Sequence, residues 1–127
     1  MAKRTYRLGN LQLKILKFLW DREAASVADV HDAVGERAGL AYTTVATMLR
    51  KMEARGLVKH RSEGRRFIYQ AAVKPDAVSR SMADDLLERL FEGSLADMLS
   101  HLLAHREVSR DELANLERLI AERKKQS

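Results

Sequence analysis

The sequence predicts a mainly α-helical protein in which three helices and a β-hairpin precede a second group of three helices. Two observations indicate this order. Apolar residues recur at helical spacing in six segments, and two short strand-like runs between residues 57 and 71 flank a turn that contains glycine. The composition agrees, because aromatic residues make up only 6% of the 127 residues and Pro75 is the single proline.

The first two helices are expected at residues 10–20 and from residue 26 to about residue 36. Asn10 is a candidate cap for the first, which carries an apolar stripe of Leu11, Ile15, Leu16, Leu19 and Trp20. Ser26 and Asp29 have the spacing of an acidic capping box at the start of the second. Its buried stripe would consist of Val27, Val30 and Val34.

The third helix, at about 42–55, divides into two faces. Its apolar face is predicted to contain Val45, Met48, Leu49 and Met52. At about 100° per residue, small polar and cationic groups centre on the other side, at Thr43, Ala46, Thr47 and Arg50. Gly56 follows at the position of a left-handed C-terminal cap.

The hairpin is expected from strands at 57–61 and 66–71 joined by a turn at 62–65. Three basic residues, Arg61, Arg65 and Arg66, lie beside that turn. Three helices followed by a basic hairpin are the order of a winged helix-turn-helix, so we expect residues 1–73 to form one such domain.

This arrangement predicts binding to a nucleic acid. A recognition helix inserts one face into the major groove, where hydroxyl groups contact base edges and methyl groups contact thymine. We expect Thr43, Ala46 and Thr47 to meet bases, Arg50 and Lys51 to meet phosphates, and the three wing arginines to meet the backbone or minor groove. The charge agrees: residues 1–75 contain 15 Lys and Arg against 7 Asp and Glu, whereas residues 76–127 contain 8 against 11.

Residues 74–127 are expected to form a three-helix dimerisation domain, with helices at 76–92, 94–105 and 109–125. Three helices in some 50 residues are close to the lower limit for a core that is stable alone. Their leucine-rich stripes are therefore predicted to bury against a second copy of the chain. The expected dimerisation residues are Leu86, Leu87, Leu90, Phe91, Leu95, Met98, Leu99, Leu102, Leu103, Leu113, Leu116 and Ile120.

Other functional classes are disfavoured by the composition. The chain has no cysteine, so disulfides, thiolate zinc sites and thiol nucleophiles are excluded. It has neither an apolar run of about 18 residues nor a signal peptide, which predicts a cytoplasmic protein without membrane insertion. His101 and His105 have the spacing of a metal pair but lack further ligands, and no catalytic motif occurs. We expect no enzyme activity, no metal and no cofactor.

The residues also resemble the penicillinase and methicillin-resistance repressor family of bacterial transcription regulators (BlaI/MecI/CopY type). The resemblance covers nearly the whole chain. It depends most on Thr43–Leu49 (TTVATML) and on Glu63–Tyr69 (EGRRFIY), with further similarity at Phe18–Trp20, Leu40–Tyr42, Gly56–Val58 and Phe91–Leu95.

The resemblance implies a homodimeric repressor that binds a double-stranded operator with TACA/TGTA-like inverted repeats. The positions that match the DNA-contacting surface of the family are Thr43, Thr44, Thr47, Arg65 and Arg66. Copper-responsive members use C-terminal cysteines, which this chain lacks. In β-lactam-responsive members a membrane-bound sensor protease cleaves a bond that aligns with His101–Leu102, where both residues differ. The resemblance nevertheless makes a membrane-bound sensor protease a candidate partner, with His101–Leu102 as its candidate cleavage site.

Two other classes of function remain open from the residues. A nonspecific nucleic-acid-binding protein would use the same basic surface without discriminating between sequences. A winged-helix protein-interaction adaptor would bind its partner through the leucine-rich helices instead. Operator preference and its loss on substitution of Thr47 distinguish these classes.

Overall fold

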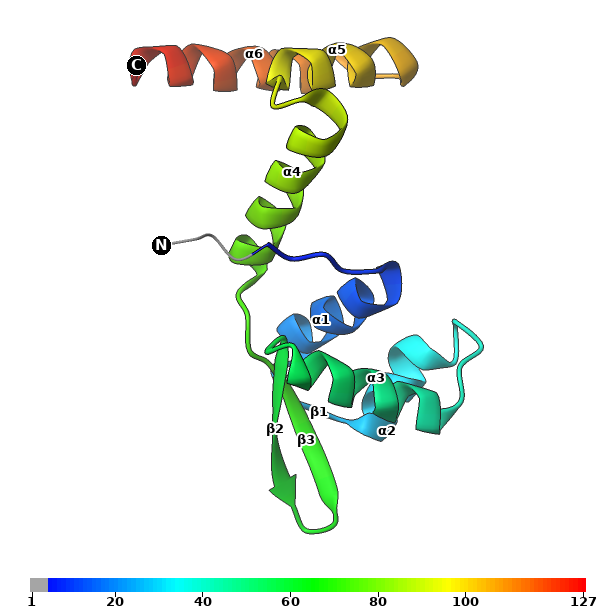
Figure 1. Cartoon of the computed structure of the whole chain (residues 1–127). Coiled ribbons are helices and arrows are strands. Elements are labelled where there is room, and N and C mark those ends of the chain that lie inside the picture. Colours follow the sequence, from blue (N-terminus) through cyan, green and yellow to red (C-terminus); the bar gives the residue numbers. More distant parts are fainter. Residues whose placement is uncertain (1–4) are drawn as a thin grey trace. The chain divides into compact units, whose positions relative to one another are not determined.

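The structure, a computed structural model, describes residues 5–127 and confirms the mainly α-helical prediction (Figure 1). Two compact units, residues 1–83 and 84–127, are described separately below. None of the helices in residues 5–127 is long and apolar enough to cross a membrane. The elements in chain order are α1 (Asn10–Arg22), β1 (Ala25–Ser26), α2 (Val27–Val30), the π-helical turn η1 (His31–Gly35), α3 (Tyr42–Ala54), β2 (Val58–Glu63), β3 (Arg66–Ala71), α4 (Pro75–Phe91), α5 (Leu95–His105) and α6 (Arg110–Lys125).

Serine side chains cap the starts of three helices, one of them at the predicted Ser26. The Ser26 hydroxyl accepts the Asp29 N–H, and the Asp29 carboxylate accepts the Ser26 N–H, both at 3.1 Å, which confirms the capping box. Ser94 and Ser109 accept the N–H groups of Asp97 and Glu112 in the same way. The cap predicted at Asn10 is wrong by one residue, because Gly9 has the extended cap conformation and its N–H donates to Gln12 Oε1.

The second helix differs from the expected continuous helix. Regular α-helix ends at Val30, and the chain widens into η1, where the Glu36 N–H donates to the His31 carbonyl at 2.8 Å. Gly35 explains why this segment can lie so close to α3. A Cβ atom at Gly35 would be only 2.7 Å from Val45 Cγ2, so a larger residue would force the two segments apart.

The small sheet has the strand order β1-β3-β2 and is antiparallel throughout. Glu63 pairs with Arg66, so the hairpin turn consists of Gly64 and Arg65 and is shorter than expected. Gly64 has a φ of 61°, a conformation that favours glycine. The two-residue strand β1, which pairs Ala25 with Tyr69 and Ser26 with Ile68, is absent from the sequence prediction.

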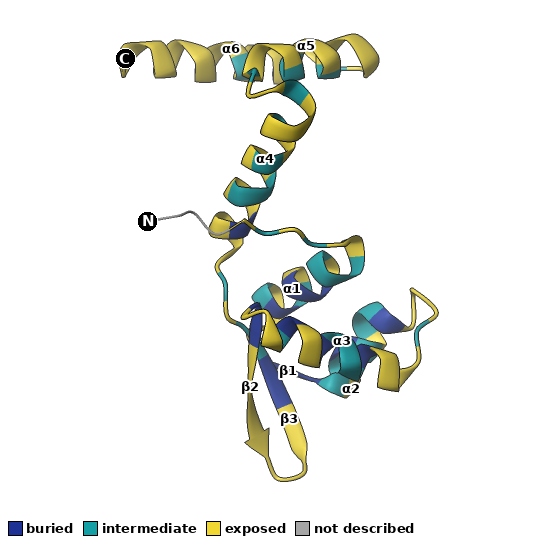
Figure 2. Cartoon of the chain, viewed as in Figure 1, coloured by how far each residue is buried: buried dark blue, intermediate teal, exposed yellow. Residues whose placement is uncertain are grey.

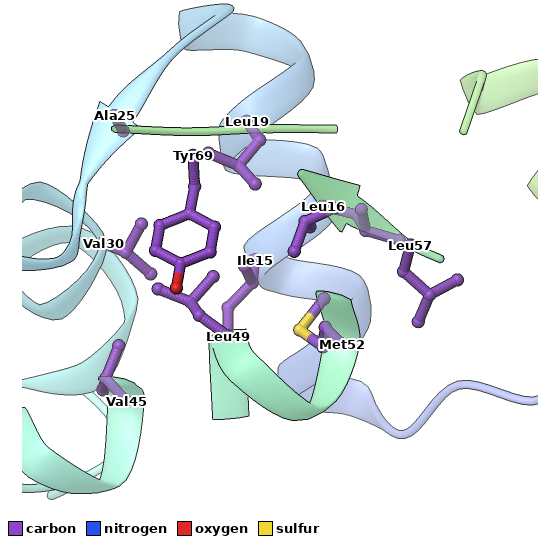
Figure 3. Packing of buried hydrophobic residues seen from close by; sticks show 11 residues of the cluster. Ile15, Leu16, Leu19, Ala25, Val30, Val45, Leu49, Met52, Leu57 and Tyr69 are labelled. Atoms are coloured by element: carbon purple, nitrogen blue, oxygen red, sulfur yellow. The ribbon is translucent and has the colours of Figure 1, made fainter. Parts of the chain in front are cut away.

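The core of residues 1–83 lies where α1, α3 and the sheet meet (Figure 2). Figure 3 shows the Tyr69 ring of β3 surrounded by aliphatic side chains from α1, α2 and α3, among them Leu19, Val30 and Leu49. Each such side chain, when fully buried, stabilises the fold by about 1.5–3 kcal/mol. The same core therefore fixes the position of α3 and of the hairpin base.

The first turns of α4 belong to this unit. Val78 is buried, and Ser81 Oγ accepts the Tyr6 N–H at 3.0 Å. The Trp20 indole N–H donates to the Val73 carbonyl at 2.9 Å and holds the segment before α4 against α1. The boundary between the two compact units falls between Ala83 and Asp84, within the residues of α4. The division into functional domains at residues 73 and 74 stays a prediction.

Asp29→Asn is expected to lower the free energy of unfolding at pH 7 by about 0.3–1 kcal/mol, because the carboxylate stabilises the N-terminus of α2. Hydrogen bonds from the Ser26 N–H and hydroxyl hold the pKa of Asp29 below its ordinary value of 3.8. This stabilisation is therefore complete above pH 3.8 and is lost as the pH falls through the lowered pKa. Urea unfolding across pH 2–7 should show the difference between the two proteins shrinking with acid, and a difference that stays constant down to pH 2 would contradict this role of Asp29.

Candidate nucleic-acid interface

The third helix divides into a buried face and an exposed face, as the spacing predicts. Val45, Leu49 and Met52 are buried, and Met48 is half-buried against the core. The helix ends in a Schellman motif: the Gly56 N–H donates to the Glu53 carbonyl and the Leu57 N–H to the Met52 carbonyl, both at 2.9 Å. Gly56 has a φ of 75°, which confirms the predicted left-handed cap.

The predicted base-contacting residues lie on the accessible side of α3. Thr43 and Thr44 are exposed, and Ala46 and Thr47 are half-buried. The Thr47 hydroxyl donates to the Thr43 carbonyl at 3.0 Å and accepts from Arg50 Nη2 at 3.2 Å. Because its proton is directed into the helix, Thr47 presents mainly a methyl group and a hydroxyl lone pair outward.

Two cations follow these threonines along α3. Arg50 and Lys51 are both exposed, and Arg50 is held by its hydrogen bond to Thr47. At the end of the helix Arg55 donates to the Arg7 carbonyl at 3.1 Å and to Gln12 Oε1 at 3.4 Å. These contacts fix the C-terminal end of α3 to the start of α1.

The hairpin keeps its three arginines exposed, but they differ in their partners. Arg61 forms an ion pair with Glu63, with Nη2 and Nε at 2.8 and 2.9 Å from Glu63 Oε2. Arg66 lies directly across the ladder from Glu63 and helps to lower the pKa of Asp29. Arg65, at the tip, makes no side-chain hydrogen bond or ion pair within residues 5–127. Sequence reasoning counted the three charges equally and missed the partial neutralisation of Arg61.

A side-chain cluster that sequence reasoning missed joins the hairpin to α3. His60 Nδ1 lies 2.7 and 2.8 Å from the two Glu53 carboxylate oxygens. The ring of Phe67 stacks on His60 with centroids 4.1 Å apart, and burial beside the Glu53 carboxylate raises the pKa of Tyr69. The hairpin base and α3 are therefore linked by polar as well as apolar contacts. No spacing in the sequence indicates this pairing, because it depends on how the chain turns at Gly56.

The second unit, residues 84–127, has no buried residue, whereas the first unit contains the hydrophobic core (Figure 2). The predicted dimerisation residues remain half-buried or exposed. Half-buried are Leu87, Phe91, Met98, Leu99, Leu102 and Leu116. Exposed are Leu86, Leu90, Leu95, Leu103, Leu113 and Ile120, with Leu90 at 66% and Leu95 at 60% exposure.

His101 and His105 lie on the surface of α5 with ring centroids 4.6 Å apart. Within the part of the chain that the structure describes, no Asp, Glu or further His joins them in a group of metal-ligand spacing. The His101–Leu102 bond lies inside α5, where the peptide groups are hydrogen-bonded in the helix. Cleavage there stays a prediction and would require α5 to open locally.

Comparisons with known proteins agree on one family. A family model described as penicillinase repressor matches residues 8–122. The chain is 36% identical to the transcriptional regulator BlaI of Mycobacterium tuberculosis (strain H37Rv) over 124 residues, which cover 96% of this chain and 88% of that protein. It is 22% identical to the penicillinase repressor of Bacillus licheniformis over 122 residues, which cover 96% of this chain and 95% of that protein.

A solved structure supports the fold. The solution structure of the DNA-binding domain of the repressor BlaI matches 60% of this chain and 93% of that chain, with a TM-score of 0.52 and 21% sequence identity. At this identity the similarity establishes the fold alone, and it agrees with the order of helices and strands described above. The match to the family model over residues 8–122 and the 36% identity to the Mycobacterium tuberculosis regulator show that the chain belongs to the penicillinase repressor family of transcriptional repressors, and the solved structure agrees with a winged helix-turn-helix fold.

Proposed function

We propose that the chain is a homodimeric repressor that binds an inverted-repeat operator in double-stranded DNA, with α3 in the major groove and the hairpin as the wing. The observation that carries this proposal is the division of α3. One face is buried in the core, while the other presents threonines and cations beside an exposed basic hairpin. Operator occupancy would then block transcription.

Base recognition is assigned to the accessible threonines of α3. Thr43 and Thr44 offer exposed hydroxyl groups, and the methyl groups of Ala46 and Thr47 suit contacts with thymine. A TACA/TGTA-like half-site contains thymines for such contacts. Each good base contact is worth about 1–3 kcal/mol of discrimination.

Backbone binding is assigned to Arg50 and Lys51 on α3 and to the wing residues Arg61, Arg65 and Arg66. These contacts neutralise phosphates and release counterions, so they give affinity with a steep salt dependence but no sequence preference. Arg65 makes no intramolecular pair within residues 5–127 and is the strongest candidate. Arg61 must share its charge with Glu63 and should contribute less.

Dimerisation is assigned to the leucine-rich helices of residues 84–127. Exposed apolar groups in a unit without a buried residue support association with a second copy, which would remove them from water. A two-fold dimer would place two copies of α3 one helical turn of DNA apart, about 34–36 Å, and would match an inverted repeat. A sensor protease that acts on α5 is retained as a further candidate partner.

Thr47→Ala should reduce the preference for the operator over a scrambled duplex by about tenfold, because it removes a methyl contact and the hydroxyl that holds Arg50. Fluorescence anisotropy with full-length protein measures both affinities. Ser79→Ala, at an exposed position of α4, should leave the preference unchanged. Equal affinity of the unmodified protein for both duplexes would indicate a nonspecific binder, and no binding to either would favour the adaptor.

Arg65→Gln should weaken binding to operator and scrambled DNA by the same factor and reduce the slope of log affinity against log salt by about 0.9, the value for one phosphate contact. Arg61→Gln should have a smaller effect because that guanidinium is already paired with Glu63. Titrations at several salt concentrations compare the two variants directly. A larger effect of Arg61→Gln would contradict the assignment of the wing contacts.

Leu90→Glu together with Leu95→Glu should convert the dimer into a monomer, since both side chains are largely exposed in one chain and would be buried between two. Light scattering after size-exclusion chromatography measures the mass. Ser100→Glu adds a charge to a polar position of α5 and serves as the control. A double variant that remains dimeric would show that these helices do not form the dimer interface.

A further inference from the structure

The π-helical turn η1 brings together three side chains that can ligate a metal. In a regular α-helix, residues 31 and 36 would lie about 140° apart around the axis. The hydrogen bond from the Glu36 N–H to the His31 carbonyl widens the turn and puts both residues on nearly the same side. One ligand atom from each of His31, Asp32 and Glu36 therefore lies within 4.8 Å of the other two.

The tautomer of His31 is set by the backbone. Its Nε2 lies 2.9 Å from the Leu40 carbonyl oxygen, and a carbonyl can only accept, so Nε2 carries the proton. In the neutral ring Nδ1 then keeps its lone pair, and it lies 3.8 Å from Asp32 Oδ1. A ring N–H donated to a backbone carbonyl, with the other nitrogen directed at the ligand set, is the arrangement found for metal-binding histidines.

The imidazole is also fixed by its neighbours, whereas the carboxylates are free to adjust. The His31 and Tyr42 rings form a T-shaped pair with centroids 6.0 Å apart, and a Cβ on Gly35 would lie 2.9 Å from His31 Cδ2. The His31 side chain is only 19% exposed, against 73% for Asp32. Because His31 Nδ1 is held in place and the Asp32 and Glu36 carboxylates are exposed, a metal site can form through rotation of the two carboxylate side chains.

We propose that His31, Asp32 and Glu36 bind one divalent transition-metal ion of the zinc type. Metal bonds of about 2.0–2.2 Å place adjacent ligands roughly 3–3.5 Å apart, so ligand atoms that lie within 4.8 Å of one another need to approach by no more than about 2 Å. Two carboxylates and a neutral imidazole balance the charge of the ion, and water completes its coordination. The imidazole favours Zn²⁺ over Mg²⁺ and Ca²⁺, which prefer sets made of oxygen alone.

The site lies in the connection between the two helices of the helix-turn-helix. Leu40, whose carbonyl accepts from His31, is two residues before α3, and Tyr42 is the first residue of that helix. A metal on Nδ1 makes the opposite ring N–H a stronger donor, which strengthens its bond to Leu40. Because the ion binds the folded state, it should stabilise residues 31–42 and raise the melting temperature.

Calorimetric titration of the metal-free, full-length protein with zinc chloride tests the site. We expect one ion per chain and a loss of more than about 100-fold in affinity for the double variant Asp32→Asn with Glu36→Gln, because loss of a group that only supports a ligand already costs about 10- to 100-fold. Both carboxylates are on the surface, so the variant should fold. The matched control replaces His101 and His105 by glutamine, which removes the competing histidine pair and should leave affinity unchanged.

Thermal melts and NMR provide independent readouts. Zinc should raise the melting temperature of the unmodified protein and of the His101 and His105 variant, but not that of the carboxylate variant. Cobalt(II) as a paramagnetic probe should broaden amide signals around residues 31–40 first. The proposal is overturned if the unmodified protein shows no zinc binding, if the carboxylate variant binds as tightly, or if broadening centres on α5.

Discussion

The burial of one face of α3 against α1 and the base of the hairpin is the constraint from which the rest of the interface follows. The apolar face of α3 must stay buried, because Val45, Leu49 and Met52 form the core together with residues of α1 and β3. These partners include Ile15, Leu19 and Tyr69. Once they are buried, helical geometry leaves Thr43, Thr44 and Arg50 on the accessible side. The residues that define the fold thus also select which side chains can reach a nucleic acid.

Two carboxylates pair with basic side chains of the hairpin and reduce the positive charge that part of the hairpin offers to a polyanion. Glu63 pairs with Arg61 inside the hairpin, and Glu53 pairs with His60 where the hairpin meets α3. Both pairs are partly exposed, so each adds little stability and mainly holds a side chain in place. Their effect on function is therefore selective: Arg65 at the tip of the hairpin keeps its whole charge for a polyanion, while the charge of Arg61 is partly balanced. A count of arginines alone overstates the strength of the wing.

Local signals made most of the fold predictable. Ser26, Ser94 and Ser109 mark helix starts through their own side-chain chemistry, and Gly56 marks a helix end through its backbone freedom. Features that depend on distant contacts were not predictable. The strand β1 has two residues and exists only through pairing with β3. The close approach of η1 to α3 depends on the absence of a Cβ at Gly35 beside Val45, and the tautomer of His31 follows from the carbonyl of Leu40.

Residues 84–127 contain no buried residue in the single chain. A unit of this size without a buried residue lacks the apolar burial that stabilises independent domains. If a second copy supplies that burial, then association and folding of these helices are one equilibrium, and its midpoint depends on protein concentration. In the proposed dimer, DNA affinity would depend on the same equilibrium, because two half-sites would be coupled only while the dimer exists. Under that proposal, an event that opens α5, including a cut within it, would release the operator without touching α3 or the wing.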